Sequence, residues 1–195
     1  RSFRHDYINI LTSLKLGIDN QDIEAIKTVY SGVLRDSGNQ FYDSKFDIAK
    51  LSNIKNDAIK SILSAKLLEA QNRGISISVE IEEPVSNFRI ELLDFITVLS
   101  VLCDNAIEAT IKATSPRMTV VFINNDDSLV LIVENSIKSE KVDVSHIFAR
   151  GYSSKGKGRG LGLHNVNSIL EKYPKSTITT RSANHLFSQT IRFCK

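Results

Sequence analysis

Apolar residues recur at helical spacing in two stretches near the start of the chain. In the first stretch they are separated by four, three and four residues, at Phe3, Tyr7, Ile10 and Leu14. In the second they are Ile23, Ile26, Tyr30 and Val33. Asp19 and Asn20 separate the stretches, which predicts a helical hairpin in residues 1–42. Because so short a hairpin cannot cover both of its apolar stripes, we expect two copies to form a dimeric four-helix bundle.

Residues 43–195 show a mixture of helical and strand patterns. Helices are predicted over 46–73, 90–112 and 162–172. Strands are predicted over 75–81, 118–123, 129–133, 176–181 and 188–193. The apolar side of the first of these helices is expected to comprise Leu51, Ile54, Ala58, Ile62 and Ala65. The pattern indicates an α+β fold with helices on one face of a mostly antiparallel sheet.

The composition of the chain limits the kinds of protein to which it can belong. The chain has 195 residues, 42% of them apolar and 24% charged, which suits one globular domain with a small appendage. Its net charge of +3 is too mild to indicate direct nucleic acid binding. No apolar run is long enough to span a bilayer, and no signal peptide is visible. Since the first residue is Arg1, we expect a soluble cytoplasmic piece of a longer protein whose remainder holds membrane segments.

The cysteines and histidines show no spacing that suggests a metal site. Cys103 and Cys194 are far apart, so they form neither a disulfide framework nor a pair of metal ligands. The four histidines are likewise scattered along the chain. A reducing compartment and the absence of a structural metal are therefore expected.

Glycines concentrate in one segment. Five of the nine lie between Gly151 and Gly162, and the last four alternate with other residues from Gly156 onward. Glycine lets backbone N–H groups approach an anion closely, and this segment leads directly into a predicted helix, whose first N–H groups favour phosphate. A flexible surface loop is the simpler interpretation of the glycines alone. The spacing matches neither the P-loop pattern nor a dinucleotide fingerprint.

The apolar helix near residue 100 carries a cluster of polar residues. Asp104, Asn105 and Glu108 fall on one side of the helical wheel. Oxygen ligands of this kind suit Mg²⁺, which takes one or two from protein and the rest from water and phosphate. A solvated stripe on an amphipathic helix explains the same pattern, and only its combination with the glycine-rich segment favours the metal.

These two segments resemble motifs of the GHKL superfamily of ATP-binding domains. Residues 103–109 resemble its N box, residues 158–163 its second glycine box, and residues 148–155 the lid segment of histidine kinases. The resemblance covers about residues 46–193 and implies a two-layer α/β sandwich of the GHKL (Bergerat) type that binds ATP and Mg²⁺. By this resemblance Asn105 would hold Mg²⁺. The residues expected at the nucleotide are Asp104, Asn105, Glu108, Asn135, Tyr152, Lys155, Gly158, Gly160, Leu161 and Gly162.

One position distinguishes the members of this superfamily that hydrolyse ATP. Those members place a water-activating glutamate one helical turn before the Mg²⁺ asparagine, where this chain has Val101. A valine cannot take a proton from water. The γ-phosphoryl group is therefore expected to pass to a side chain.

The predicted acceptor lies near the start of the chain. Arg4, His5, Asp6 and Asn9 resemble the phosphoacceptor motif of histidine kinases, and the heptad spacing places His5 on the outward side of the predicted bundle. His5 would attack phosphorus, and Asp6 would orient its ring and accept its proton. Asn9 would position a water for the reverse reaction, the dephosphorylation of a partner's aspartate. The alternative is that Asn9 is an ordinary exposed residue.

The chain departs from the general histidine kinase pattern at the adenine motif. Most kinases carry Asp-x-Gly-x-Gly after the central strand, where this chain has Glu134, Asn135 and Ser136. Asn135 or Glu134 would accept a hydrogen bond from the adenine amine. This departure is similar to the peptide-pheromone receptor kinases of quorum sensing. By that resemblance the protein would be a homodimeric sensor at the cytoplasmic face of the membrane that phosphorylates a DNA-binding response regulator of the LytTR type.

Two other functions remain open on the sequence. One is a phosphotransferase scaffold with a degenerate ATP-binding domain, which the glycine-rich segment and Asn105 argue against. The other is a GHKL ATPase or serine kinase, which His5 and Val101 argue against.

Overall fold

The chain comprises two compact units, residues 1–44 and 45–195. The computed structural model describes residues 12–36, 48–145, 147 and 162–195. The division lies close to the predicted boundary after residue 42. The role of each unit stays a prediction at this stage.

In the first unit, residues 12–19 are helical and a turn at residues 20–21 leads to α2 (Ile23–Asp36). Asp22 caps α2, because its carboxylate accepts a hydrogen bond from the backbone N–H of Ala25 at 2.9 Å. Gly17 is buried, and a Cβ atom there would lie 2.7 Å from Cγ1 of Ile26, so the two helical segments approach too closely for a larger residue. Residues 1–11, including His5, and residues 37–42 lie outside the described residues, and the pairing of two copies into a bundle stays a prediction.

The second unit is built on a five-stranded sheet. Its strands are β1 (Ser76–Ile81), β2 (Arg117–Asn124), β3 (Ser128–Ser136), β4 (Thr177–Ala183) and β5 (Leu186–Cys194). Their order across the sheet is β1-β2-β3-β5-β4, and every neighbouring pair is antiparallel except β1 and β2. The predicted mostly antiparallel α+β arrangement is confirmed. The single parallel pair follows from the long connection through a helix between β1 and β2.

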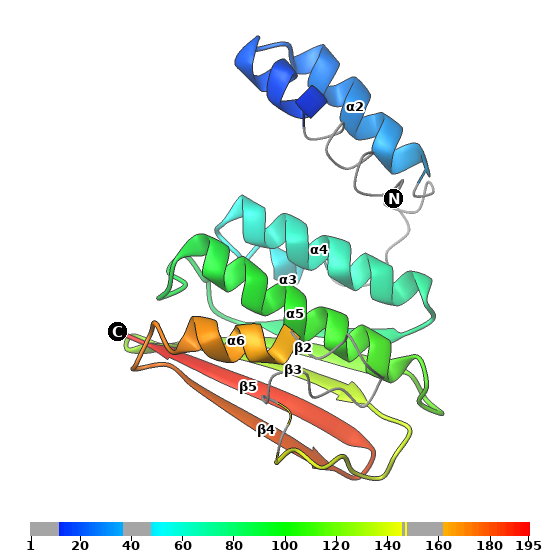
Figure 1. Cartoon of the computed structure of the whole chain (residues 1–195), viewed down its shortest axis with the longest axis vertical. Helices are drawn as coiled ribbons and strands as arrows, with labels where there is room; N and C mark the ends of the chain where they lie inside the picture. Colours follow the sequence, from blue (N-terminus) through cyan, green and yellow to red (C-terminus); the bar gives the residue numbers. More distant parts are fainter. Residues whose placement is uncertain (1–11, 37–47, 146, 148–161) are drawn as a thin grey trace. The chain divides into compact units, whose positions relative to one another are not determined.

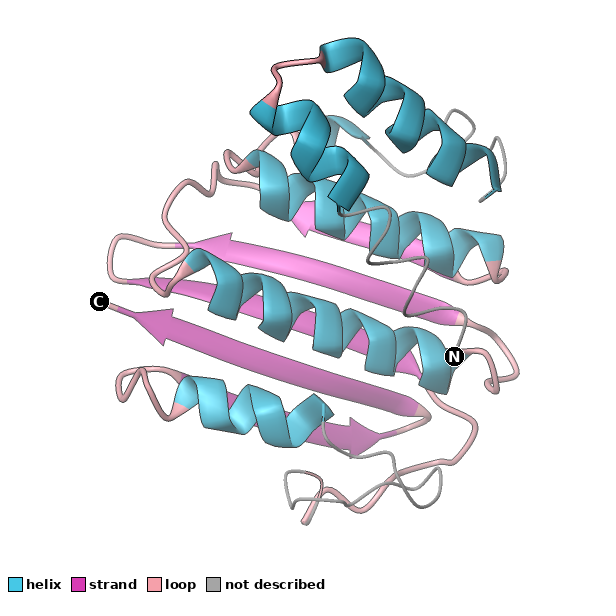
Figure 2. Ribbon diagram, turned by 45° about the horizontal axis from the view of Figure 1, so that its top comes forward, coloured by secondary structure: helices cyan, strands magenta, loops and turns pink. Residues whose placement is uncertain are grey.

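The helices of this unit cover one face of the sheet (Figures 1 and 2). They are α3 (Ile48–Leu51), α4 (Asp57–Asn72), α5 (Leu92–Thr110) and α6 (Gly162–Leu170). Alternation along β3 turns the buried side chains Leu129, Leu131 and Val133 toward these helices. No helix formed by the described residues lies on the opposite face of the sheet in either view.

The prediction of one continuous helix over residues 46–73 was wrong. Ile54 leaves the helical path to form an isolated parallel bridge with Val85, and Asn56 caps a new helix by accepting from Ile59 N–H at 3.1 Å. The apolar face predicted for this region was also partly wrong, because Ala58 and Ala65 are exposed. The residues of α4 that face the core are instead Ile59, Leu63, Leu67 and Ala70. Two backbone hydrogen bonds with Val85 outweigh the helical propensity of the sequence there: Lys55 N–H donates to the Val85 carbonyl oxygen and Val85 N–H to the Asn53 carbonyl oxygen, each at 2.8 Å.

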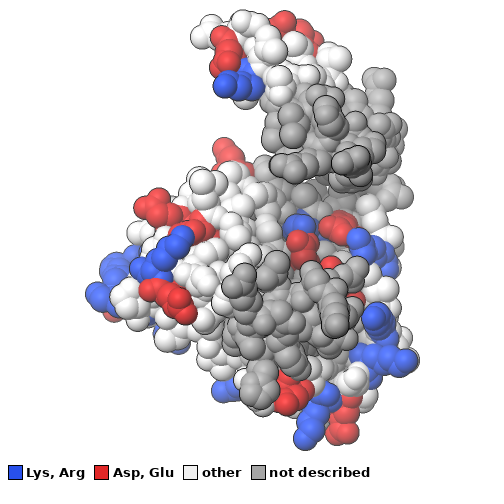
Figure 3. All heavy atoms as spheres, in the orientation of Figure 1, with Lys and Arg blue, Asp and Glu red and all other residues white. Residues whose placement is uncertain are grey.

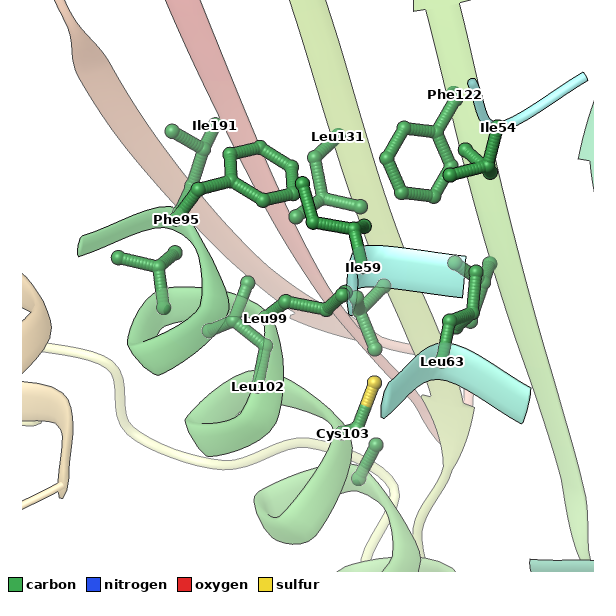
Figure 4. Close-up of a cluster of buried hydrophobic side chains, with 14 of the residues drawn as sticks. Ile54, Ile59, Leu63, Phe95, Leu99, Leu102, Cys103, Phe122, Leu131 and Ile191 are labelled. Atoms are coloured by element: carbon green, nitrogen blue, oxygen red, sulfur yellow. The ribbon is translucent and has the colours of Figure 1, made fainter. Parts of the chain in front are cut away.

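The hydrophobic core lies between α5, α4 and the sheet. Figure 4 shows Phe95, Leu99, Leu102 and Cys103 of α5 among side chains from the sheet and from α4. The Phe95 ring lies edge-on to Phe88, with centroids 4.7 Å apart, and 5.4 Å from the centroid of Phe193. Burial raises the pKa of the Cys103 thiol to about 12, so it packs as a neutral apolar group.

A polar contact fastens the end of α6 to the start of α5. The Tyr173 hydroxyl donates to Asp94 Oδ2 at 2.7 Å and accepts from Glu91 N–H at 3.2 Å, while Lys172 Nζ lies 3.1 Å from Asp94 Oδ1. The hydrogen bond from Tyr173, more than the nearby Lys172, lowers the pKa of Asp94 against the opposing effect of burial. The carboxylate is therefore held in its ionised form.

The described surface carries charges of both signs. In Figure 3 basic and acidic side chains are interspersed across the visible face. Many of them pair along helices, as Arg73 and Glu69 do at 2.7 Å. Within the described ranges, none of the helices is both long and apolar enough to cross a membrane.

Replacing Phe95 by alanine should lower the free energy of unfolding of the second unit by about 3–5 kcal/mol, because it removes a fully buried ring and leaves a cavity. Leu93→Ala, on the same helix but 75% exposed, should change it by less than about 0.5 kcal/mol. Urea unfolding followed by circular dichroism measures both. Equal effects of the two substitutions would contradict the described core.

The hydrogen bond between Tyr173 and Asp94 should make stability depend on pH. Because the pKa of Asp94 is below its ordinary value of 3.8, the bond stabilises the fold above that pH, and its contribution is lost as the pH falls through the lowered pKa. Tyr173→Phe should therefore cost about 1 kcal/mol at pH 7 and less at pH 3. Unfolding by urea at several pH values tests this, and Asp94→Asn should remove the pH-dependent part from both backgrounds. A cost that grows toward low pH would refute it.

Candidate functional site

The start of α6 lies directly against the middle of α5. A Cβ atom on Gly162 would lie 3.1 Å from Cγ1 of Val101 and 3.9 Å from Nδ2 of Asn105. Val101 and Asn105 are one helical turn apart, so they form adjacent points on the face of α5 that receives α6. A larger residue at position 162 would have to displace Val101. Glycine therefore allows the helix to begin beside Asn105.

Asn105 has an unsatisfied polar group at this contact. Its Nδ2 atom is buried and has no hydrogen-bond partner among the residues that the structure describes. A buried amide without a partner is unfavourable, and such a group in a native fold calls for an explanation. Because the two ends of an amide are assigned by their hydrogen-bonding surroundings, either the oxygen or the nitrogen of Asn105 can be presented here.

Asp104 points in a different direction from Asn105. Its Oδ1 atom lies 2.5 Å from Nζ of Lys66 on α4, and this Lys66 nitrogen is also 3.9 Å from Glu69. The polar residues predicted to cluster on α5 thus face different neighbours. Asn105 lies beside α6, and Asp104 forms an ion pair with α4. Glu108 is exposed. A role for Asp104 or Glu108 at a nucleotide stays a prediction.

Asn135 is 2% exposed near the end of β3. Its Nδ2 donates to the carbonyl oxygen of Ser136 at 2.9 Å, and Thr110 Oγ1, at the end of α5, donates to the same oxygen at 3.1 Å. Alternation along β3 places Asn135 on the side of the sheet that faces the helices and Glu134 on the other side. Of the two acceptors considered for adenine, only Asn135 therefore lies on the same side of the sheet as α5 and α6.

Two side chains near this region were missed by sequence reasoning. Lys66 lies in the middle of α4, where a lysine is typical of a solvated helix face, and nothing in the sequence indicates its ion pair with Asp104. Gln189 occupies an inward-facing position of β5 and is 2% exposed. The sequence does contain a signal for Gln189, because this residue interrupts an apolar alternation formed by Phe187, Ile191 and Phe193.

The remaining predicted site residues cannot be placed beside these. His5, Asp6 and Asn9 lie outside the described residues, as do those expected at the nucleotide other than Asp104, Asn105, Glu108, Asn135 and Gly162. Of the predicted site residues, the structure therefore places Asn105 and Gly162 next to each other. Asn135 is connected with them through the end of α5.

The residues at this site fit a magnesium nucleotide. An amide oxygen is a ligand that Mg²⁺ accepts, and Asn105, whose Nδ2 has no partner among the described residues, would supply one. The N–H groups at the start of α6 would favour a phosphate group, whose charge the helix dipole attracts.

Comparisons with known proteins agree on one family. A family model described as a GHKL domain matches residues 90–194. Sensor protein CitS of Bacillus subtilis (strain 168) is 28% identical over 181 residues, which are 88% of this chain and 31% of that protein. Sensor histidine kinase DcuS of Escherichia coli (strain K12) is 27% identical over 194 residues, 97% of this chain and 34% of that protein. The chain thus spans about a third of the length of these curated relatives.

Solved structures of histidine kinases share the fold. The nucleotide-free catalytic domain of histidine kinase ThkA matches with a TM-score of 0.61 at 20% identity, over 72% of this chain and 92% of that chain. Full-length ShkA in complex with AMPPNP matches with a TM-score of 0.58 at 15% identity, over 75% of this chain and 30% of that chain. At these identities the likeness concerns the fold. Since the family model matches more than half of the chain and the fold agrees, the chain belongs to the GHKL domain family.

Proposed function

We propose that this chain is the catalytic part of a sensor histidine kinase of a two-component system. The observation that carries the proposal is the unpartnered Asn105 amide, which lies beside the glycine that begins α6 in a GHKL domain. The relatives CitS and DcuS are named as sensor proteins, and the second as a histidine kinase. ATP would bind in the second unit, and His5 would receive its γ-phosphoryl group.

Asn105 and the start of α6 would hold the magnesium nucleotide. The ion would neutralise part of the triphosphate charge, with Asn105 as its protein ligand. Residues 150–162 would cover the phosphates, as the resemblance to the lid segment implies. Lys66 pairs with Asp104, so the negative charge of Asp104 is balanced next to Asn105.

Val101 favours transfer to a side chain over hydrolysis. It packs against the start of α6 with Cγ1 3.1 Å from where a Cβ of Gly162 would lie, and it offers no base for an attacking water. The acceptor would be the neutral imidazole of His5. Its nitrogen forms a bond to the γ-phosphorus while the bond from that phosphorus to the β–γ bridging oxygen breaks, and the imidazole proton passes to Asp6.

The wider context of the protein is also proposed. Two copies would pair through the first unit, where Leu16, Ile18 and Ile23 are between 57% and 63% exposed in a single chain. The phosphoryl group would pass from His5 to an aspartate of a response regulator. The motifs favour the quorum-sensing kinases that include AgrC, whose regulators are of the LytTR type, with a membrane sensor in the rest of the protein.

Asn105→Ala should weaken binding of ATP in the presence of Mg²⁺ by about tenfold or more, because it removes the amide that would hold the ion. Isothermal titration calorimetry on the purified chain measures this. Asn72→Ala, at the exposed end of α4, is the matched control and should leave affinity unchanged. If the wild-type chain retained no adenine nucleotide, the kinase assignment would fall and a scaffold would remain.

His5→Gln should abolish autophosphorylation while leaving affinity for ATP unchanged, because the acceptor lies outside the nucleotide site. Incubation with labelled ATP and Mg²⁺ should give an acid-labile, base-stable adduct in the wild type only. His185→Asn is a suitable control, since His185 is exposed and asparagine tolerates its φ of 59°. Labelling that persisted without His5, or that resisted acid, would refute the assignment.

A further inference from the structure

A second unpartnered amide, in addition to that of Asn105, lies on the side of the sheet that faces the helices. Gln189 is 2% exposed on β5, and its Nε2 atom has no hydrogen-bond partner among the described residues. Thr180 lies directly opposite Gln189 on β4. Among the described residues, the Thr180 hydroxyl oxygen is also buried without a hydrogen-bond partner. Two adjacent polar side chains therefore lack the hydrogen bonds that buried groups need.

Gln189 shares its side of the sheet with Asn135. The register pairs Gln189 with Val133 and Phe187 with Asn135, so Asn135 is the diagonal neighbour of Gln189. Side chains in this relation are about 7–8 Å apart at their Cα atoms and point to the same face. A flat group of the size of a purine edge can contact both amides at that separation.

This position connects with the site on α5. Asn135 and Thr110 of α5 bind the same carbonyl oxygen of Ser136. Asn105 lies five positions before Thr110 on the same helix, about 7.5 Å along its axis at 1.5 Å per residue. Asn105 and the contact of Asn135 with Thr110 therefore both belong to the C-terminal half of α5, and Gln189 is the diagonal neighbour of Asn135 on the sheet.

The choice of glutamine at this place is informative. The other inward positions of β5 include Ile191 and Phe193, both fully buried in the core. An apolar side chain would satisfy the packing there without leaving an amide unpaired. A glutamine in this environment is explained if a partner completes its hydrogen bonds.

We propose that Gln189 is a specificity-determining residue that recognises the base of the nucleotide together with Asn135. Gln189 Nε2 donates to a ring nitrogen of adenine, and Asn135 Oδ1 accepts from the exocyclic amine. Guanine presents a carbonyl oxygen in place of that amine, which Asn135 Oδ1 cannot bind. This inference rests on the proposed function and adds the residue that reads the base.

Calorimetric titration of the full chain tests it with ATP, 1-deaza-ATP and 7-deaza-ATP. The wild type should bind ATP about fivefold to tenfold more tightly than the analogue that lacks the contacted nitrogen, which is the ratio expected for one hydrogen bond. Gln189→Met keeps the length of the side chain and removes the donor. This variant should bind ATP only as tightly as the wild type binds the analogue that lacks the contacted nitrogen. It should therefore bind ATP and that analogue with equal affinity.

Thr190→Val is the matched control, because Thr190 neighbours Gln189 but faces the other side of the sheet. It should retain the affinity and the discrimination of the wild type. Thermal unfolding monitors the folding of each variant.

The possible failures are distinguishable. If the wild type binds no nucleotide at all, the proposed function itself fails. If the wild type binds ATP and both analogues equally, the inference is overturned without recourse to any variant, and the proposed function stands. If Gln189→Met distinguishes the nucleotides as the wild type does, the inference is likewise overturned, and a buried water between Gln189 and Thr180 becomes the explanation.

Discussion

The contact between Gly162 and the middle of α5 is the constraint on which the arrangement of the site depends. Because position 162 has no side chain, α6 begins against Val101 and Asn105, where a Cβ atom would be only 3.1 Å from Val101 Cγ1. The glycine-rich sequence ends at this point, so the phosphate-binding role proposed for it and the Asn105 amide would meet at one place. A change of residue at 162 would affect packing and chemistry together, since the same close approach serves both.

The two ends of α6 are held by different kinds of interaction. At its start the contact is steric and depends on a missing side chain. Beyond its end, Tyr173 and Lys172 bind Asp94 at the beginning of α5. The polar contact fixes the end that is distant from Asn105, and it is strongest while Asp94 is ionised, as the lowered pKa of this residue indicates. The helix that follows the glycine-rich segment is therefore anchored at the end away from the proposed nucleotide.

Some polar side chains of the second unit have defined partners. Lys66 neutralises Asp104 across α4 and α5, and Thr110 and Asn135 share one carbonyl oxygen. Asn105 and Gln189 differ from these because each keeps a buried nitrogen unpaired within the described chain. An apolar core penalises such groups, and this penalty is the physical basis for assigning both of them to ligand recognition.

Sequence alone determined the element types, the α+β class and the candidate residues Asn105 and Gly162, because hydrophobic periodicity and glycine spacing are local properties. It placed the two strands β2 and β3. It failed where a distant partner decides. The bridge between Ile54 and Val85 broke the predicted helix, Lys66 formed an ion pair with Asp104 that the sequence does not indicate, and the sheet register made Gln189 a neighbour of Asn135. These outcomes depend on contacts between residues far apart in the chain, which only the tertiary structure brings together.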